Sequence, residues 1–185
     1  MKQIEALLTS LGYKPWISDR GSLPLKPGGT AFDACLAAVA RCDVFLGIIR
    51  GYYGTGRIGA EPSITHQEIR AAIQLDKVRF MAVEREVAIA REVLKPFRTY
   101  SEGPLAGKPK PHTEFNFKGN AILSDFRVIE MYEEAMRLDQ PDYKDRRDNW
   151  VQEYADESEL LSFVADQLTD RSAIEEEVAR RKGGV

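Results

Sequence analysis

The chain has 185 residues, of which 43% are hydrophobic and 30% are charged, as is ordinary for one globular domain. Its formal charge of −3, with acidic and basic residues intermixed, argues against a nucleic-acid binder that works through bulk positive charge. The sequence has no apolar signal region, and no stretch approaches the roughly 18 apolar residues of a membrane span. We therefore expect a cytoplasmic protein with neither a membrane nor a nucleic-acid partner. Cys35 and Cys42 do not form a CxxC motif, so we expect two core thiols and no metal site.

The first elements are short. Residues 2–11 carry apolar side chains at helical spacing, and Gly12 is a natural stop. Residues 13–18 predict a short strand at a sheet edge. Residues 19–29 have the composition of turns, and Thr30 is suited to cap a helix over 31–40.

The centre of the chain has the clearest pattern. Residues 42–49 form a nearly continuous apolar run, typical of a parallel strand covered on both faces. A glycine-rich loop over 50–62 leads into a predicted helix at 63–75 and a second apolar strand at 78–83. This β–loop–α–β order predicts a parallel sheet with a right-handed crossover.

The pattern weakens after residue 84. We expect helices at 86–97 and 125–138, separated by a long irregular excursion over 99–121. A last strand at 150–154 precedes one amphipathic helix that runs from Ser158 toward Lys182. We expect a single domain over 1–185, with a core formed by 1–84 and 150–182 and an insertion at about 85–149.

The glycine-rich loop is a candidate ligand site, because ligands of parallel sheets bind beyond the carboxyl ends of the strands. Gly51 and Gly54 allow close approach of the backbone to a ligand. Arg50 and Arg57 are suited to phosphate, and the rings of Tyr52 and Tyr53 to stacking on a base. The loop matches neither a Walker A nor a dinucleotide-binding pattern, and a flexible solvated loop is the alternative.

Glu68 is the candidate catalytic residue. It falls within the apolar arc of the predicted helix, where a carboxylate is costly unless it has a partner or lines a cleft. Thr65 and Glu68 also match a capping box, which would explain Glu68 without any chemistry if the helix starts at Thr65. If the helix starts at Ser63, Glu68 lies one turn in and is free to act. His66 is expected to be solvated, and neither it nor His112 is assigned a role.

Several segments together resemble the DUF4062 family. These are the strand Cys42–Ile49 (CDVFLGII), the loop Gly51–Gly54 (GYYG), the helix start Ser63–Glu68 (SITHQE) and the closing segment Trp150–Leu168. The resemblance covers most of residues 4–84 and 150–168. The family is similar to TIR domains and nucleoside 2-deoxyribosyltransferases. It implies a flavodoxin-like (TIR-like) three-layer α/β fold with a mostly parallel sheet, an irregular insertion and a C-terminal helix.

The resemblance also implies a function. NAD-cleaving TIR enzymes carry a glutamate in a segment S/D-x-x-x-x-E, whose spacing Ser63 and Glu68 match. Glu68 would hold a ribose hydroxyl and favour an oxocarbenium-like transition state during cleavage of an N-glycosidic bond. The candidate substrate-binding residues are then Ser63 together with the loop residues Arg50, Gly51, Tyr52, Tyr53 and Gly54. NAD or a related small nucleotide would be a substrate, with no cofactor required, in bacterial signalling or defence. The alternative is a non-catalytic module that senses a nucleotide or self-assembles.

The chain departs from the family at its start. Family members have a strand and loop ahead of the first helix, whereas this chain begins inside that helix. Either the sequence is a truncated one or the sheet is completed differently, by a partner. A sheet without this strand has unpaired edges, which favours a homo-oligomer or a protein partner.

Overall fold

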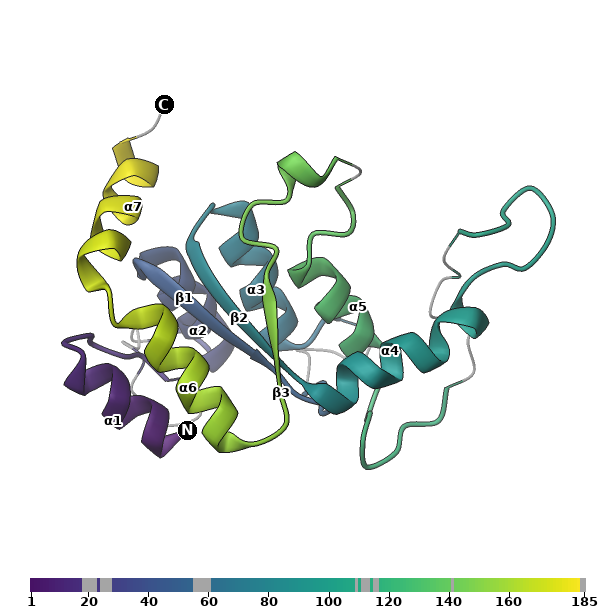
Figure 1. Cartoon of the computed structure of the whole chain (residues 1–185), viewed down its shortest axis with the longest axis horizontal. Coiled ribbons are helices and arrows are strands. Elements are labelled where there is room, and N and C mark those ends of the chain that lie inside the picture. Colours follow the sequence, from purple (N-terminus) through teal and green to yellow (C-terminus); the bar gives the residue numbers. More distant parts are fainter. Residues whose placement is uncertain are drawn as a thin grey trace.

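The computed structural model is a layered α/β domain with a parallel sheet between helices (Figure 1). It describes residues 1–17, 23, 28–54, 61–108, 110, 114, 117–140 and 142–183. Arg57 and His112, considered above, lie outside the described residues.

Among the residues described, the sheet has three strands, all parallel, in the order β1 (Val44–Ile49), β2 (Val78–Glu84) and β3 (Val151–Tyr154). The register pairs Ile49 with Val83 and Glu84 with Tyr154. The predicted α/β class and parallel sheet are confirmed. Within the described residues β1 pairs with β2 alone, so its outer edge is free of ladder hydrogen bonds.

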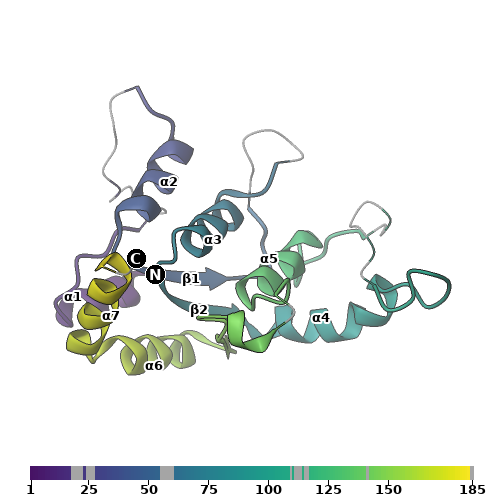
Figure 2. The ribbon, with the colours of Figure 1, turned by 90° about the horizontal axis from the view of Figure 1, so that it is seen from above.

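Helices cover both faces of the sheet. Figure 2 shows α1 (Lys2–Ser10), α6 (Glu157–Leu168) and α7 (Arg171–Gly183) on one face. On the other face lie α3 (Ile64–Gln74) and α5 (Arg127–Ala135), with α2 (Ala31–Arg41) packed on α3. Helix α4 (Arg85–Arg98) continues directly from the end of β2, and a 3-10 turn, η3 (Tyr143–Asp145), precedes β3.

Successive side chains of β2 point to opposite faces of the sheet and contribute to two separate hydrophobic cores. Met81 and Val83 pack into the core on the α3 and α5 side, whereas Ala82 packs into the core on the α1 and α6 side. The central strand is therefore buried on both faces, as its apolar run predicts.

Two of the predicted elements are wrong, the strand at 13–18 and the single C-terminal helix. Residues 13–17 form no strand, because Tyr13 is held beside α6 by a 3.0 Å hydrogen bond from its hydroxyl to the carbonyl of Leu168. The C-terminal tail is two helices rather than one. Asp170 caps the start of α7, since its carboxylate accepts a 3.1 Å hydrogen bond from the N–H of Ala173.

The interval 85–149 supplies much of the core on the α3 side. Helix α5 buries Val128, Ile129 and Met131 completely or nearly so, and the segment before it buries Leu123. Among the described residues of the irregular excursion expected over 99–121, regular structure is limited to a bridge between Tyr100 and Ala106 and a 3-10 conformation at Glu114.

Candidate functional site

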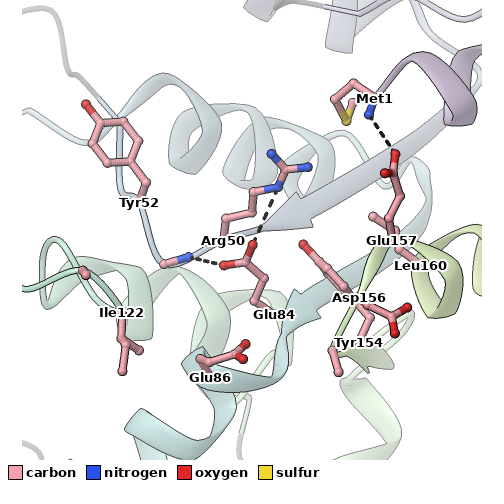
Figure 3. Close-up of a pocket in the computed structure, with 13 residues that line it drawn as sticks. Met1, Arg50, Tyr52, Glu84, Glu86, Ile122, Tyr154, Asp156, Glu157 and Leu160 are labelled. Atoms are coloured by element: carbon pink, nitrogen blue, oxygen red, sulfur yellow. Dashed lines mark hydrogen bonds and ion pairs between the residues drawn. The ribbon is translucent and has the colours of Figure 1, made fainter.

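A pocket of about 620 Å³ opens at the carboxyl ends of all three strands (Figure 3). This volume falls within the range of small-molecule sites. The pocket is lined by the loop that follows β1, by the end of β2, by the turn between β3 and α6, and by Ala121 and Ile122.

One row of the sheet register forms the centre of the site. The pairing of Ile49 with Val83 brings Arg50 beside Glu84, and Glu84 is itself paired with Tyr154. All three side chains line the pocket. Because the register sets their order, the row Arg50–Glu84–Tyr154 is a direct product of the parallel sheet.

Glu84 is held in place from two sides. Its Oε2 accepts a 2.9 Å hydrogen bond from the N–H of Gly51, and its Oε1 lies 3.9 Å from Arg50 Nε. Figure 3 shows the carboxylate between these two groups. Its side chain remains 34% exposed, so an incoming ligand can reach it.

Tyr154 places a buried hydroxyl next to the pocket. The residue is 5% exposed, and its hydroxyl makes no hydrogen bond to the described residues. Burial raises the pKa of this hydroxyl, and the nearby Arg50 guanidinium partly offsets the rise. The hydroxyl is itself buried beside Arg50, so it belongs to the wall behind Glu84 rather than to the open surface of the pocket.

Carboxylates outnumber cations around the pocket. Glu86, Asp156 and Glu157 line it together with Glu84, whereas the positive groups are Arg50 and the amino group of Met1. Asp156 also caps α6 through a 2.9 Å hydrogen bond from Glu159 N–H. Such a lining favours sugar hydroxyls or a cationic centre over a phosphate-rich ligand.

The structure separates the candidate residues into two groups. Arg50, Gly51 and Tyr52 line the pocket, and the Tyr52 side chain is 70% exposed. Tyr53 and Gly54 instead turn back toward the start of α3.

Glu68 lies in the second turn of α3 and is half-buried. The helix is capped by Ser63, whose hydroxyl accepts a 3.3 Å hydrogen bond from the N–H of His66. Of the two helix starts considered, the structure has the one at Ser63, which rules out a Thr65 capping box. No residue of α3 is among those that line the pocket, so Glu68 is not brought to it.

His66 is buried, so the expectation of a solvated residue is wrong. It is 1% exposed, and its Nδ1 lies 2.8 Å from the Tyr53 hydroxyl. Its Nε2 lies 3.1 Å from Glu134 Oε2, at ion-pair distance but outside hydrogen-bond geometry. Arg70 donates two hydrogen bonds, of 2.6 and 2.7 Å, to the same carboxylate.

These contacts control the charge of Glu134. Burial alone would raise the pKa of its carboxyl, but Arg70 and His66 outweigh burial and lower that pKa to about 2. This network connects the loop after β1 to α3 and α5. It lies on one face of the sheet, and the pocket-lining row lies on the other.

The sequence reasoning missed Glu84, Glu86, Tyr154, Asp156 and Glu157. A signal existed for them, because Glu84 directly follows the predicted strand 78–83 and Tyr154 ends the predicted strand 150–154. Both positions are carboxyl ends of parallel strands. The described residues contain no cluster of three or more side chains suited to a metal ion.

Among the helices of the described part, none is both long enough and apolar enough to cross a membrane. No curated protein and no solved structure matches this chain. The sequence model of one family, described as "Domain of unknown function (DUF4062)", matches residues 1–180 and so also runs through the interval 85–149. On the strength of this match over nearly its whole length, the chain belongs to the DUF4062 family.

Proposed function

We propose that this domain binds a ribosylated base in the pocket at the strand ends and hydrolyses its N-glycosidic bond, with a nucleoside suiting the acidic lining better than NAD, which carries a diphosphate. The observation that carries the proposal is the row Arg50–Glu84–Tyr154, which presents a fixed and partly exposed carboxylate to a pocket of suitable size. The TIR-like chemistry that the sequence resemblance implies supports the same reaction.

The lining is suited to this chemistry. Carboxylates accept hydrogen bonds from ribose hydroxyls and stabilise the positive charge that develops on the sugar as the bond to the base breaks. Glu84 is preorganised for this role by Gly51 and Arg50. The exposed ring of Tyr52, which Figure 3 places on the opposite side of Arg50 from Asp156, offers a surface for the base.

The resemblance and the geometry favour different carboxylates. The resemblance assigns catalysis to Glu68, whereas the pocket favours Glu84. The test is to incubate the protein with NAD and with single nucleosides and to measure the released base by chromatography. We expect Glu84→Gln to lower kcat/KM by about a hundredfold or more. Glu102→Gln, at an exposed position of the excursion, serves as the control and keeps full activity.

The outcomes separate the assignments. Loss of activity in Glu68→Gln with full activity in Glu84→Gln would move the chemistry to α3 and away from this pocket. If the wild-type chain releases no base from any of these substrates, the catalytic proposal fails.

A second candidate function is a module that senses a nucleotide or self-assembles without turnover. It is favoured by the outer edge of β1, whose residues Val44–Ile49 contain no charge and no proline to deter pairing with another strand. Calorimetric binding of a nucleoside without base release would support this reading over the enzyme.

A further inference from the structure

Glu86 brings to the pocket a negative charge that forms no ion pair among the described residues. It lines the pocket from the first turn of α4, and its side chain is exposed. Glu84, by contrast, has Arg50 beside it, and Figure 3 shows Glu86 on the opposite side of Glu84 from Arg50. The N-terminus of α4 offsets only about half a charge. The pocket therefore keeps a negative potential near Glu86.

The other carboxylates of the lining already have partners. Asp156 accepts the hydrogen bond that caps α6, and Glu157 lies 3.7 Å from the amino group of Met1. The charge that a ligand can neutralise is thus concentrated at Glu86. A positively charged ligand gains from this charge, whereas a neutral ligand of the same shape does not.

The exposed ring of Tyr52 adds a second preference for positive charge. Its side chain is 70% exposed and lines the pocket. The face of an aromatic ring attracts a cation, and a flat cation can also stack on it. Ala121 and Ile122 extend the apolar part of the lining, which suits a planar base.

The pocket offers no group suited to protonating a leaving base. The described residues that line it include no histidine, lysine or cysteine, and the Tyr154 hydroxyl is buried in the wall behind Glu84. A neutral purine leaves readily only when a general acid protonates its ring. A base whose ring nitrogen is already alkylated carries a positive charge and leaves as a neutral molecule without this proton.

We propose that the pocket selects nucleosides whose base carries a permanent positive charge, and that Glu86 sets this selection. The inference rests on the proposed function, because it assigns a substrate class to the same pocket and the same reaction. In that reaction the bond between C1′ of the ribose and the ring nitrogen breaks, and its electron pair neutralises the base. Water adds to C1′, and the proton that it loses passes to Glu84 and then to solvent. The products are ribose, the neutral base and a proton.

Binding measures the selection without turnover. The probes are 7-methylguanosine, whose base is a cation at mildly acidic pH, and 7-methyl-7-deazaguanosine, a neutral analogue of nearly the same shape. Calorimetry of the full chain in the cold, where turnover is slow, is expected to show that the cation binds about tenfold more tightly. Equal affinities for the two probes overturn the proposal, as does a cation that does not bind.

A charge-neutral variant tests the role of Glu86. Glu86→Gln keeps the shape of the side chain and is expected to reduce the preference for the cation to about threefold, with the affinity for the neutral probe unchanged. Glu102→Gln removes the same charge outside the pocket and is expected to keep the full preference. If Glu86→Gln lowers the melting temperature but keeps the full preference, the residue acts only on the start of α4, and the role proposed for it is wrong.

Turnover separates this inference from the proposed function. Base release is measured for 7-methylguanosine and guanosine, and each rate is divided by the spontaneous rate of the same nucleoside, because methylation weakens the bond. We expect the ratio to be about tenfold higher for 7-methylguanosine. Equal ratios would overturn the selection and leave the cleavage in place. Selective binding without release of either base would refute the cleavage and leave the selection in place.

Discussion

Replacing Gly51 with alanine tests whether the segment around Ile122, which follows the irregular excursion, holds this side of the pocket in place. A Cβ at this position would lie 1.8 Å from the carbonyl oxygen of Ile122. The Cβ is fixed by the backbone of residue 51 and the oxygen belongs to the backbone of Ile122, so neither can rotate away. The segment around Ile122 must therefore move by at least about 1.2 Å to bring the distance between the two atoms to 3.0 Å.

The structure sets the size of the effect. The N–H of Ser124 donates a 2.8 Å hydrogen bond to the carbonyl of Gly51, and its hydroxyl accepts a 2.9 Å hydrogen bond from the N–H of Tyr53. Each bond contributes about 1 kcal/mol to stability. Leu123 is 1% exposed, and withdrawing it in part costs up to about 3 kcal/mol more. We therefore expect the free energy of unfolding to fall by about 2–5 kcal/mol.

Urea unfolding followed by circular dichroism measures this change. With a slope of about 2 kcal/mol per molar urea, the midpoint falls by about 1–2.5 M. Gly183→Ala is the matched control, because a Cβ there meets no atom within 4 Å. If Gly51→Ala unfolds at the same midpoint as the wild-type chain, the segment around Ile122 is not held as the structure shows.

Three further predictions concern charged and buried groups. Because the pKa of Glu134 falls to about 2 on folding from an ordinary value of 4.5, its contribution is present above about pH 4.5 and is lost as the pH falls toward 2; melting temperatures measured over this range should decline less steeply in Glu134→Gln. Tyr53→Phe leaves Nδ1 of His66 buried without a partner and should lower the free energy of unfolding by about 1–2 kcal/mol in urea, whereas a change within error would show that the bond contributes nothing. Arg181→Met removes two hydrogen bonds to Asp148, of 2.7 and 3.1 Å, and should speed amide hydrogen exchange in α7 with little change in β2; unchanged exchange in α7 would mean that other contacts hold this helix.

Local sequence patterns predicted most of the helices and strands, because each pattern depends on residues within a short stretch of the chain. Thr30 and Asp33 form the reciprocal cap of α2, with the Thr30 hydroxyl accepting from the Asp33 N–H at 3.1 Å. The apolar runs of β1 and β2 mark strands buried in a parallel sheet. Where prediction failed, at Tyr13 and at Asp170, the deciding contacts are a hydrogen bond to a distant helix and a cap that ends one helical pattern and starts another.

The candidate site was predictable only in part. Arg50, Gly51 and Tyr52 follow an obvious strand, so their position at the end of the sheet was predictable, and all three line the pocket. The position of Glu68 on an apolar arc was also correct as a local statement, since the residue is half-buried. Which pocket a carboxylate reaches depends on how the helix is rotated against the sheet, and no periodicity contains that information.

The sequence by itself determined the α/β class, the parallel strands, the cap at Thr30 and the loop at the end of β1, because each depends on side chains that are neighbours along the chain. Only the tertiary structure decided that Glu84 and Tyr154 stand in one row with Arg50, and that His66 is enclosed between Tyr53 and Glu134. These contacts join residues tens of positions apart, and they follow from strand register and helix packing, which are properties of the assembled layers.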